Sequence, residues 1–309
     1  MSAASEPIAP AGPPLPTRPG LRAPIAASAA PSRRRGWREP SLLPGFAPAM
    51  AFTLLYLSLL VLLPLAALAA RPWEHGWQGL WTTLASPRVL AALRLSFGLS
   101  FVAAGLNVVM GLVVAWALAR YDFPGKRLAD AAVDLPFALP TAVAGIALAA
   151  IYAPNGWVGA LLAPAGIKVA YTPLGVLIAL IAVGLPFIVR GVQPVLKDFD
   201  AEVEEAALTL GAGPLRRTWQ LVLPALTPSL ITGFSLAFAR AVGEYGSVIF
   251  IAGNMPMRSE IAPLLIVIEL EQFNYAGAAS IGLVMLLLSF AVLITINLVQ
   301  LAAARRGRR

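Results

Sequence analysis

Six long runs of apolar residues dominate the chain, and shorter polar segments separate them. The first run, residues 46–70, holds 25 residues without a charge. About 20 apolar residues make a helix long enough to cross the hydrocarbon core of a bilayer. The pattern therefore predicts an all-α membrane protein with six transmembrane helices. Their expected ranges are 46–70, 89–119, 131–152, 173–192, 226–252 and 276–303.

The connecting segments carry their own signals. Residues 71–88 contain three tryptophans and are expected to form an interfacial loop with aromatic anchoring. Residues 154–164 are rich in Pro and Gly and predict a turn region, and residues 253–275 predict a loop. Gly184 and Pro186 are expected to interrupt the fourth helix.

The two ends of the chain differ from its middle. Residues 1–40 are rich in Pro, Ala and Arg, and such a segment cannot bury enough apolar surface to order itself, so we expect a disordered tail. The alternative of a signal or transit peptide is disfavoured because no short apolar segment starts near Met1. The membrane domain is expected to cover residues 41–304, and residues 305–309 form a basic C-terminus.

Composition narrows the class of protein. Hydrophobic residues make up 59% of the chain and charged residues 12%, whereas soluble domains carry about 25% charged residues. The net charge of +8 does not predict nucleic-acid binding, because the basic residues lie in clusters between the apolar runs. The chain has no cysteine and a single histidine, His75, so no metal site is predicted.

The basic residues also predict orientation, because Lys and Arg favour the cytoplasmic side. With both termini inside, the inner segments hold 17 of the 23 Lys and Arg residues. Of the outer residues, Arg88, Arg94 and Lys168 could steer an anion, although snorkelling or contact with a partner is the favoured interpretation. Ser96, Ser100 and Ala104 repeat every four residues and suggest a helix-packing seam, or only the usual abundance of small residues.

The most ordered polar segment, residues 201–224, lies between the fourth and fifth expected helices. Acidic residues start a short helix there, Gly211 and Gly213 stop it, and Pro214 begins a second short helix that Pro224 is expected to end. This predicts a surface helix–turn–helix shaped to dock into a groove on another protein.

The spacing of this segment resembles the coupling-loop signature EAA–x3–G–x9–I–x–LP of ABC importer permeases. Only the isoleucine position departs, where this chain has leucine. The matching residues are Glu205, Ala206, Ala207, Gly211, Leu221, Leu223 and Pro224.

The resemblance implies the type I importer permease fold and a division of labour. It implies a second, W-type permease, a dimer of ATPase subunits that grips the coupling helix and binds ATP and Mg²⁺, and a periplasmic binding protein, in a bacterial inner membrane. The chain itself is expected to be non-catalytic and to hold no cofactor. None of its lysines (Lys126, Lys168 and Lys197) completes a phosphate-binding Gly-x4-Gly-Lys-Ser/Thr motif.

A second informative stretch, residues 240–256, places Arg240 and Glu244 within the fifth expected helix, where charges are costly. The two are four residues apart, so they form either a structural ion pair or part of an anion pathway with Tyr245 and Asn254. This stretch is similar to the T-type permeases of sulfate/thiosulfate importers, and molybdate permeases share a closely similar pattern.

Other classes fit less well. A stand-alone carrier explains the intramembrane charges but not the ordered segment 201–224. A membrane enzyme is disfavoured because the chain has no cysteine and no nucleophile elbow. The aspartates near the third helix are interpreted as part of a solvated loop. These aspartates are Asp122, Asp130 and Asp134.

Overall fold

The computed structural model describes residues 46–306. The predicted tail of residues 1–40 and the last three residues of the basic C-terminus lie outside the described residues. The chain divides into two compact units, residues 1–55 and 56–309, and the described part of the first is the start of helix α1 (Phe46–Leu57).

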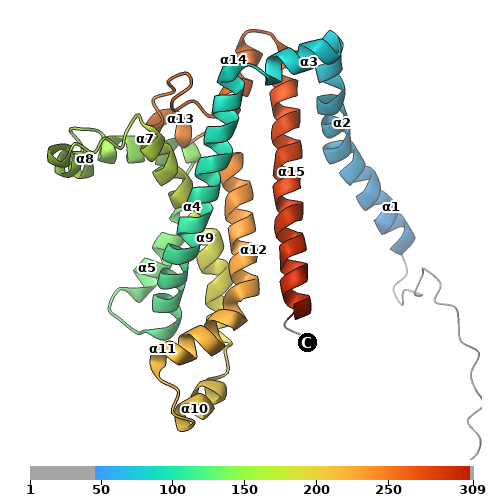
Figure 1. The fold of residues 1–309 in the computed structure, drawn as a ribbon. Coiled ribbons are helices and arrows are strands. Elements are labelled where there is room, and N and C mark those ends of the chain that lie inside the picture. Colours follow the sequence, from blue (N-terminus) through green and yellow to red (C-terminus); the bar gives the residue numbers. More distant parts are fainter. Residues whose placement is uncertain (1–45, 307–309) are drawn as a thin grey trace, which may run out of the picture. The chain divides into compact units, whose positions relative to one another are not determined.

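Every regular element within residues 46–306 is helical (Figure 1). Six segments are long and apolar enough to cross a membrane, so the predicted number is confirmed. They are Pro48–Glu74, Pro87–Arg120, Thr141–Ala165, Pro173–Lys197, Pro214–Val242 and Tyr275–Leu298. The first of them contains most of α1, a π-helical turn (Ser58–Leu62), α2 (Leu63–Ala70) and the start of a 3-10 turn (Arg71–His75).

Three helices form the central bundle: α4 (Pro87–Arg120), α9 (Pro173–Lys197) and α12 (Leu223–Val242) pack against one another. Their interface buries a continuous apolar cluster that includes Ala104, Ile188 and Phe238. The small-residue stripe predicted on α4 is buried, with Ser96, Ser100 and Ala104 exposed by 4%, 1% and 0%. Small side chains let the backbones of α4 and its neighbours approach closely.

Helix α9 continues to Lys197, so the expected interruption at Gly184 and Pro186 is wrong. A proline removes one backbone hydrogen bond inside a helix. Packing against α4 supports this part of α9, where the side-chain Nδ2 of Asn107 donates to the carbonyl of Ile181 over 3.1 Å. Gly184 leaves room for that amide, since a Cβ there would lie 2.5 Å from Asn107 Nδ2.

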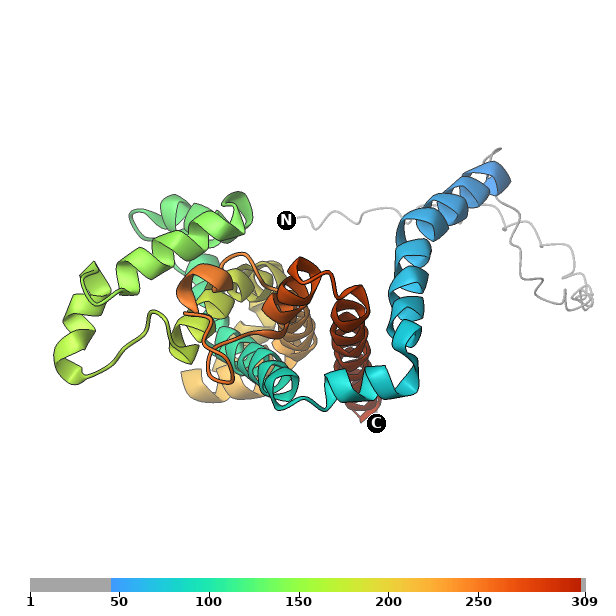
Figure 2. The ribbon, with the colours of Figure 1, turned by 90° about the horizontal axis from the view of Figure 1, so that it is seen from above.

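The third expected helix, residues 131–152, is instead divided into pieces. These are α5 (Lys126–Val133), α6 (Leu135–Ala138), α7 (Thr141–Tyr152), α8 (Trp157–Leu162) and a 3-10 turn (Ala163–Ala165). Leu139 is extended because it precedes Pro140, and a residue before proline avoids the helical region. The α7–α8 segment lies on the opposite side of the central bundle from α15 (Tyr275–Arg306), as Figure 2 shows.

Two segments expected to be loops contain helices. Residues 71–88 form a 3-10 turn (Arg71–His75) and α3 (Gly76–Leu84), and α14 (Ala262–Glu271) lies within residues 253–275. Trp73 and Trp77 stack with ring centroids 5.7 Å apart and are exposed, as residues that anchor at a membrane interface are. Helices α3 and α14 lie at one end of the bundle, while α10 (Ala201–Thr209) and α11 (Pro214–Arg217) lie at the other (Figure 1).

Candidate coupling surface and intramembrane ion pair

The ordered polar segment begins with helix α10. Asp200 caps its N-terminus by accepting the backbone N–H of Glu202 over 2.9 Å, and acidic side chains fill its first turn. The helix stops at Gly211, which has a φ of +79° and donates its N–H to the carbonyl of Leu208 over 2.9 Å. Glu205 and Ala206 are exposed on this helix, and Ala207 is half-buried.

The second half of the segment differs from expectation, because Pro224 does not end a helix. Helix α11 runs through a π-helical turn (Thr218–Val222) directly into α12. The N–H of Leu223 bonds to the carbonyl of Thr218 in this turn, and Pro224, which has no N–H, stands where the π-helical turn passes into α12. The second short helix is thus the start of the fifth span.

A cavity of about 220 Å³ separates α10 from the helix that follows it. Two matching positions of the coupling signature, Ala207 and Leu221, share its wall with Arg216 and Arg217. Arg216 Nε donates to Gln220 Oε1 over 3.0 Å, and Arg217 Nε is buried with no hydrogen-bond partner among residues 46–306. Folding therefore brings residues from the first and second halves of the signature to one hollow lined by two arginines.

Arg240, in the last turn of α12, and Glu244, just beyond the end of that helix, form an ion pair. The expected single helix 226–252 is wrong, because α12 ends at Val242 and a short helix α13 (Val248–Ile251) follows. The side chain of Glu244 is only 2% exposed, and its Oε1 accepts the backbone N–H of Ser247 over 2.9 Å and the Ser247 hydroxyl over 2.8 Å. The carboxylate therefore both pairs with Arg240 and holds the break in the helix.

The other two residues expected near this pair have different surroundings. Tyr245 is half-buried beside Glu244 in the break. Asn254 follows α13 with a φ of +52°, and its Nδ2 donates to the carbonyl of Ile249 over 2.9 Å. Its recorded bond thus goes to the backbone and not to Arg240, although its buried Oδ1 has no partner within the described part of the chain.

The break between α12 and α13 rests on the start of α7. A Cβ at Gly246 would lie 2.1 Å from Thr141 Oγ1, and a Cβ at Gly145 would lie 2.3 Å from the backbone oxygen of Ser247. Gly145 therefore permits direct backbone contact between α7 and the segment that carries Glu244, and Gly246 leaves room for the Thr141 side chain.

Comparison with known proteins decides what kind of protein has this geometry. Residues 107–309 match the family described as binding-protein-dependent transport system inner membrane component. The chain belongs to this family.

Named relatives of this permease come from several bacteria. The sulfate transport system permease protein CysT of Synechococcus elongatus is 47% identical over 249 residues, which cover 81% of this chain and 90% of the relative. The protein of the same name from Salmonella typhimurium is 46% identical over 268 residues, which cover 87% and 96%.

A solved structure supports the fold. A bacterial ABC transporter involved in the import of the acidic polysaccharide alginate aligns with a TM-score of 0.69 at 14% identity. The alignment covers 82% of this chain and 94% of the compared chain. The permease therefore has the importer permease fold that the sequence predicted.

Sequence reasoning missed a polar cluster between α5 and α9 of the permease. Arg190 uses all five of its N–H donors. Its Nε and Nη2 donate to the two oxygens of the Asp134 carboxylate over 2.8 and 2.6 Å, and Nη2 also donates to the Asp130 carbonyl over 2.8 Å. Its Nη1 donates to Asp130 Oδ1 over 2.7 Å and to Gln193 Oε1 over 2.8 Å. The hydrogen bond from Arg190 lowers the pKa of Asp130. The interpretation of Asp130 and Asp134 as merely solvated is therefore wrong, while Asp122 is 99% exposed beside Lys126.

Replacing Arg190 by methionine is expected to lower the thermal stability of the purified permease. The change leaves two carboxylates without their shared partner, at a cost of about 2 kcal/mol, or about 5 °C in Tm. Arg190→Lys should recover less than half of this, because an ammonium cannot form the bidentate contact. Lys126→Met, which breaks the exposed pair with Asp122, serves as the control and should change Tm by about 1 °C or less. Equal melting of the Arg190→Met and Lys126→Met variants would contradict the stabilising role of the cluster.

At the opposite end of the permease, Arg88 and Glu260 form a bidentate pair. Arg88 Nε and Nη2 donate to the two carboxylate oxygens over 2.8 and 2.6 Å, and the Glu260 side chain is 2% exposed. Arg88, one of the outer residues that could steer an anion, is therefore held in an ion pair, and its side chain stays 43% exposed.

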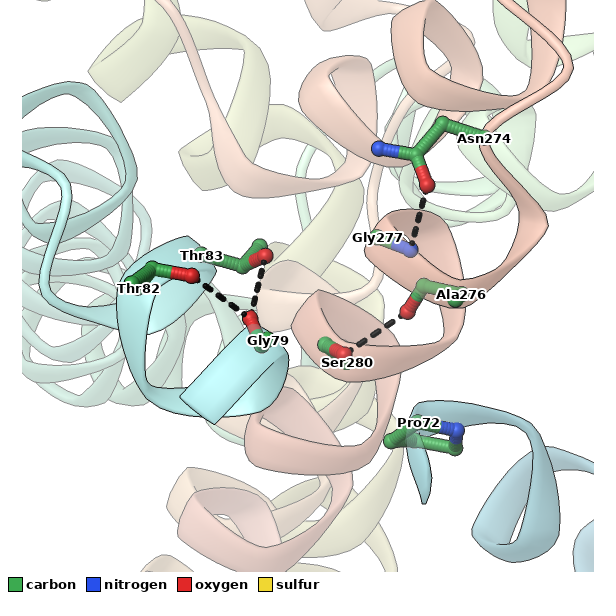
Figure 3. A pocket seen from close by; sticks show the side chains of 8 residues that line it. All are labelled: Pro72, Gly79, Thr82, Thr83, Asn274, Ala276, Gly277 and Ser280. Atoms are coloured by element: carbon green, nitrogen blue, oxygen red, sulfur yellow. Dashed lines mark hydrogen bonds between the residues drawn. The ribbon is translucent and has the colours of Figure 1, made fainter. Parts of the chain in front are cut away.

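A pocket of about 200 Å³ lies between α3 and the start of α15, at the same end (Figure 3). Its polar groups already have partners: the hydroxyls of Thr82 and Thr83 both bond to the carbonyl of Gly79, and the Ser280 hydroxyl bonds to that of Ala276. The pocket therefore offers no free donor from these hydroxyls. Within residues 46–306 no group of three or more His, Cys, Asp and Glu residues could hold a metal ion.

Proposed function

We propose that the chain is the membrane subunit of an ATP-driven sulfate importer, in which it forms half of the translocation path. The observation that carries this proposal is the coupling signature, folded as an exposed helix and turn between the fourth and fifth spans of a family member. The names of the relatives, sulfate transport system permease, supply the substrate. Thiosulfate, which shares the charge and tetrahedral shape of sulfate, is included in the proposal.

The docking partner is a dimer of ATPase subunits that binds ATP and Mg²⁺. Glu205, Ala206 and Ala207 present the exposed face of α10, and Gly211 sets the turn behind it. The cationic hollow beside Arg216 and Arg217 would receive acidic or carbonyl groups of the ATPase. Leu221, Leu223 and Pro224 fix where the turn joins the fifth span.

The orientation follows from charge. The end of the bundle that carries α10 also holds Arg120, Lys126, Lys197 and the end of α15, and positive residues favour the cytoplasmic side (Figure 1). We place both termini in the cytoplasm of a bacterium and the chain in its inner membrane. A W-type permease would complete the path, and a periplasmic binding protein would deliver the anion to the opposite end.

The path itself is proposed to pass Arg240, whose side chain is 36% exposed while its partner Glu244 is 2% exposed. This asymmetry leaves one side of the guanidinium accessible to a dianion, with Tyr245 and Asn254 nearby in sequence. Glu244 would reduce the net positive charge at Arg240, so the anion would be bound weakly there and could leave. Affinity would then reside in the binding protein.

Uptake by the assembled importer tests the proposal. The permease is co-expressed with its partner permease, ATPase and binding protein, and the complex is reconstituted in vesicles. These vesicles are expected to transport radiolabelled sulfate only when ATP is present on the side of the membrane that carries the ATPase. Accumulation should stop without the ATPase. Sulfate uptake by the chain alone without ATP, or uptake of molybdate but not sulfate, would contradict the proposal.

A further inference from the structure

The coupling helix α10 is linked to the bundle at a third point besides its two chain ends. Its chain ends connect to α9 through residues 198–200 and to α11 through residues 210–213. The side chains of Arg120, at the end of α4, and Glu204, in the first turn of α10, form an ion pair. Among residues 46–306, it is the one recorded hydrogen bond or ion pair between α10 and a spanning helix.

Both partners are held in place for this contact. The side chains are 26% and 22% exposed, so the pair is largely shielded from water. Arg120 lies over the ring of Trp116, one turn earlier on α4, with 5.8 Å between its guanidinium carbon and the ring centroid. The charges also suit their helices, since a cation is favoured at the C-terminus of α4 and an anion at the N-terminus of α10.

We propose that Arg120 and Glu204 are positioning residues that fix α10 to the central bundle, so that movement imposed on α10 reaches α4, α9 and α12 together. Without the pair, no hydrogen bond or ion pair given for residues 46–306 joins α10 to a spanning helix, and one of its two short linkers contains Gly211 with its φ of +79°. The helix would then pivot on these linkers, and motion of a bound ATPase would be lost in the pivot.

This inference rests on the proposed function and adds a specific residue pair to it. The neighbouring Glu205 belongs to the coupling signature, whereas Glu204 is outside that signature and turns toward α4. Neither Arg120 nor Glu204 is required to touch the ATPase. Loss of the pair should therefore reduce transport per ATP without reducing ATPase binding.

A double-mutant cycle on the reconstituted importer tests the pair. The variants Arg120→Gln, Glu204→Gln and the double variant are compared by sulfate transported per ATP hydrolysed. Each single change is expected to lower this ratio by about fivefold, and the double change should lower it no further, because the same interaction is lost in all three. Glu202→Gln and Arg127→Gln, at exposed sites on α10 and α5, are the matched controls and should keep the wild-type ratio.

Two further measurements separate the possible outcomes. Hydrogen–deuterium exchange of residues 201–209 in the assembled importer should quicken in the single variants and not in the controls. Recovery of the ATPase on the purified permease should stay at the wild-type level in all variants. Wild-type coupling in either single variant, or losses that multiply in the double variant, would overturn the inference. A wild-type importer that fails to bind an ATPase would instead overturn the proposed function.

Discussion

Replacing Gly211 with valine is expected to abolish most ATP-driven uptake while leaving the importer assembled in the membrane. Gly211 has a φ of +79°, a conformation that costs L-residues about 1–2 kcal/mol and β-branched residues more. No atom lies within 4 Å of where the new Cβ would be, so the cost comes from the backbone and not from a clash. The exposed turn would relieve this strain by adopting another backbone conformation, and α10 would then no longer be aligned with the hollow beside it. We expect uptake in vesicles to fall by about tenfold, the factor that corresponds to about 1.4 kcal/mol.

Two matched variants separate backbone strain from side-chain bulk. Gly213→Val places the same side chain two residues away, where φ is −65° and ψ is 165°, a region that valine readily adopts. Gly211→Asn keeps a residue that tolerates the left-handed region. Both should retain at least about half of the wild-type uptake, because neither strains the turn. Loss of uptake in Gly213→Val equal to that in Gly211→Val would show that the turn geometry is not the cause.

The sequence predicted the number of spans but not their breaks, for reasons that lie in tertiary contacts. Apolar runs report length in a bilayer directly, so six spans were visible. Proline was a poor guide to where helices end: Pro140 does interrupt the expected third helix, residues 131–152, whereas Pro186 does not break α9. Pro186 is buried in α9, which packs against α4 and α12, and Asn107 of α4 bonds to the Ile181 carbonyl although the two residues are 74 apart in the chain.

The candidate site divides in the same way. The coupling signature lies in one short segment of the chain, so its spacing could be recognised. The acidic residues at the start of that segment and the glycines after them predicted where α10 begins and ends. Arg190 and Asp130 lie 60 residues apart, and Arg120 and Glu204 lie 84 apart. No local pattern links residues at such distances. The pair of Arg240 and Glu244 was predicted because its members are four residues apart, but the break that Glu244 stabilises depends on Gly246 contacting α7.

Replacing Gly145 with alanine is expected to destabilise the permease, although alanine normally stabilises a helix. The new Cβ would lie 2.3 Å from the carbonyl oxygen and 2.7 Å from the Cα of Ser247, and neither backbone atom can rotate away. Helix α7 and the α12–α13 break must separate, at a cost of roughly 2–3 kcal/mol after the gain in helix propensity. This corresponds to a fall of about 5–10 °C in the Tm of the purified chain.

Gly105→Ala is expected to change Tm in the opposite direction in the same assay. Gly105 lies inside α4 and no atom lies within 4 Å of its Cβ position, so alanine there should raise Tm slightly through helix propensity alone. Because Glu244 and Arg240 sit on the segment that Gly145 supports, Gly145→Ala should also reduce sulfate uptake at temperatures where the protein stays folded. If Gly145→Ala and Gly105→Ala raised Tm alike, the close contact between α7 and Ser247 would be refuted. The support of the Arg240–Glu244 pair by α7 would then be refuted with it.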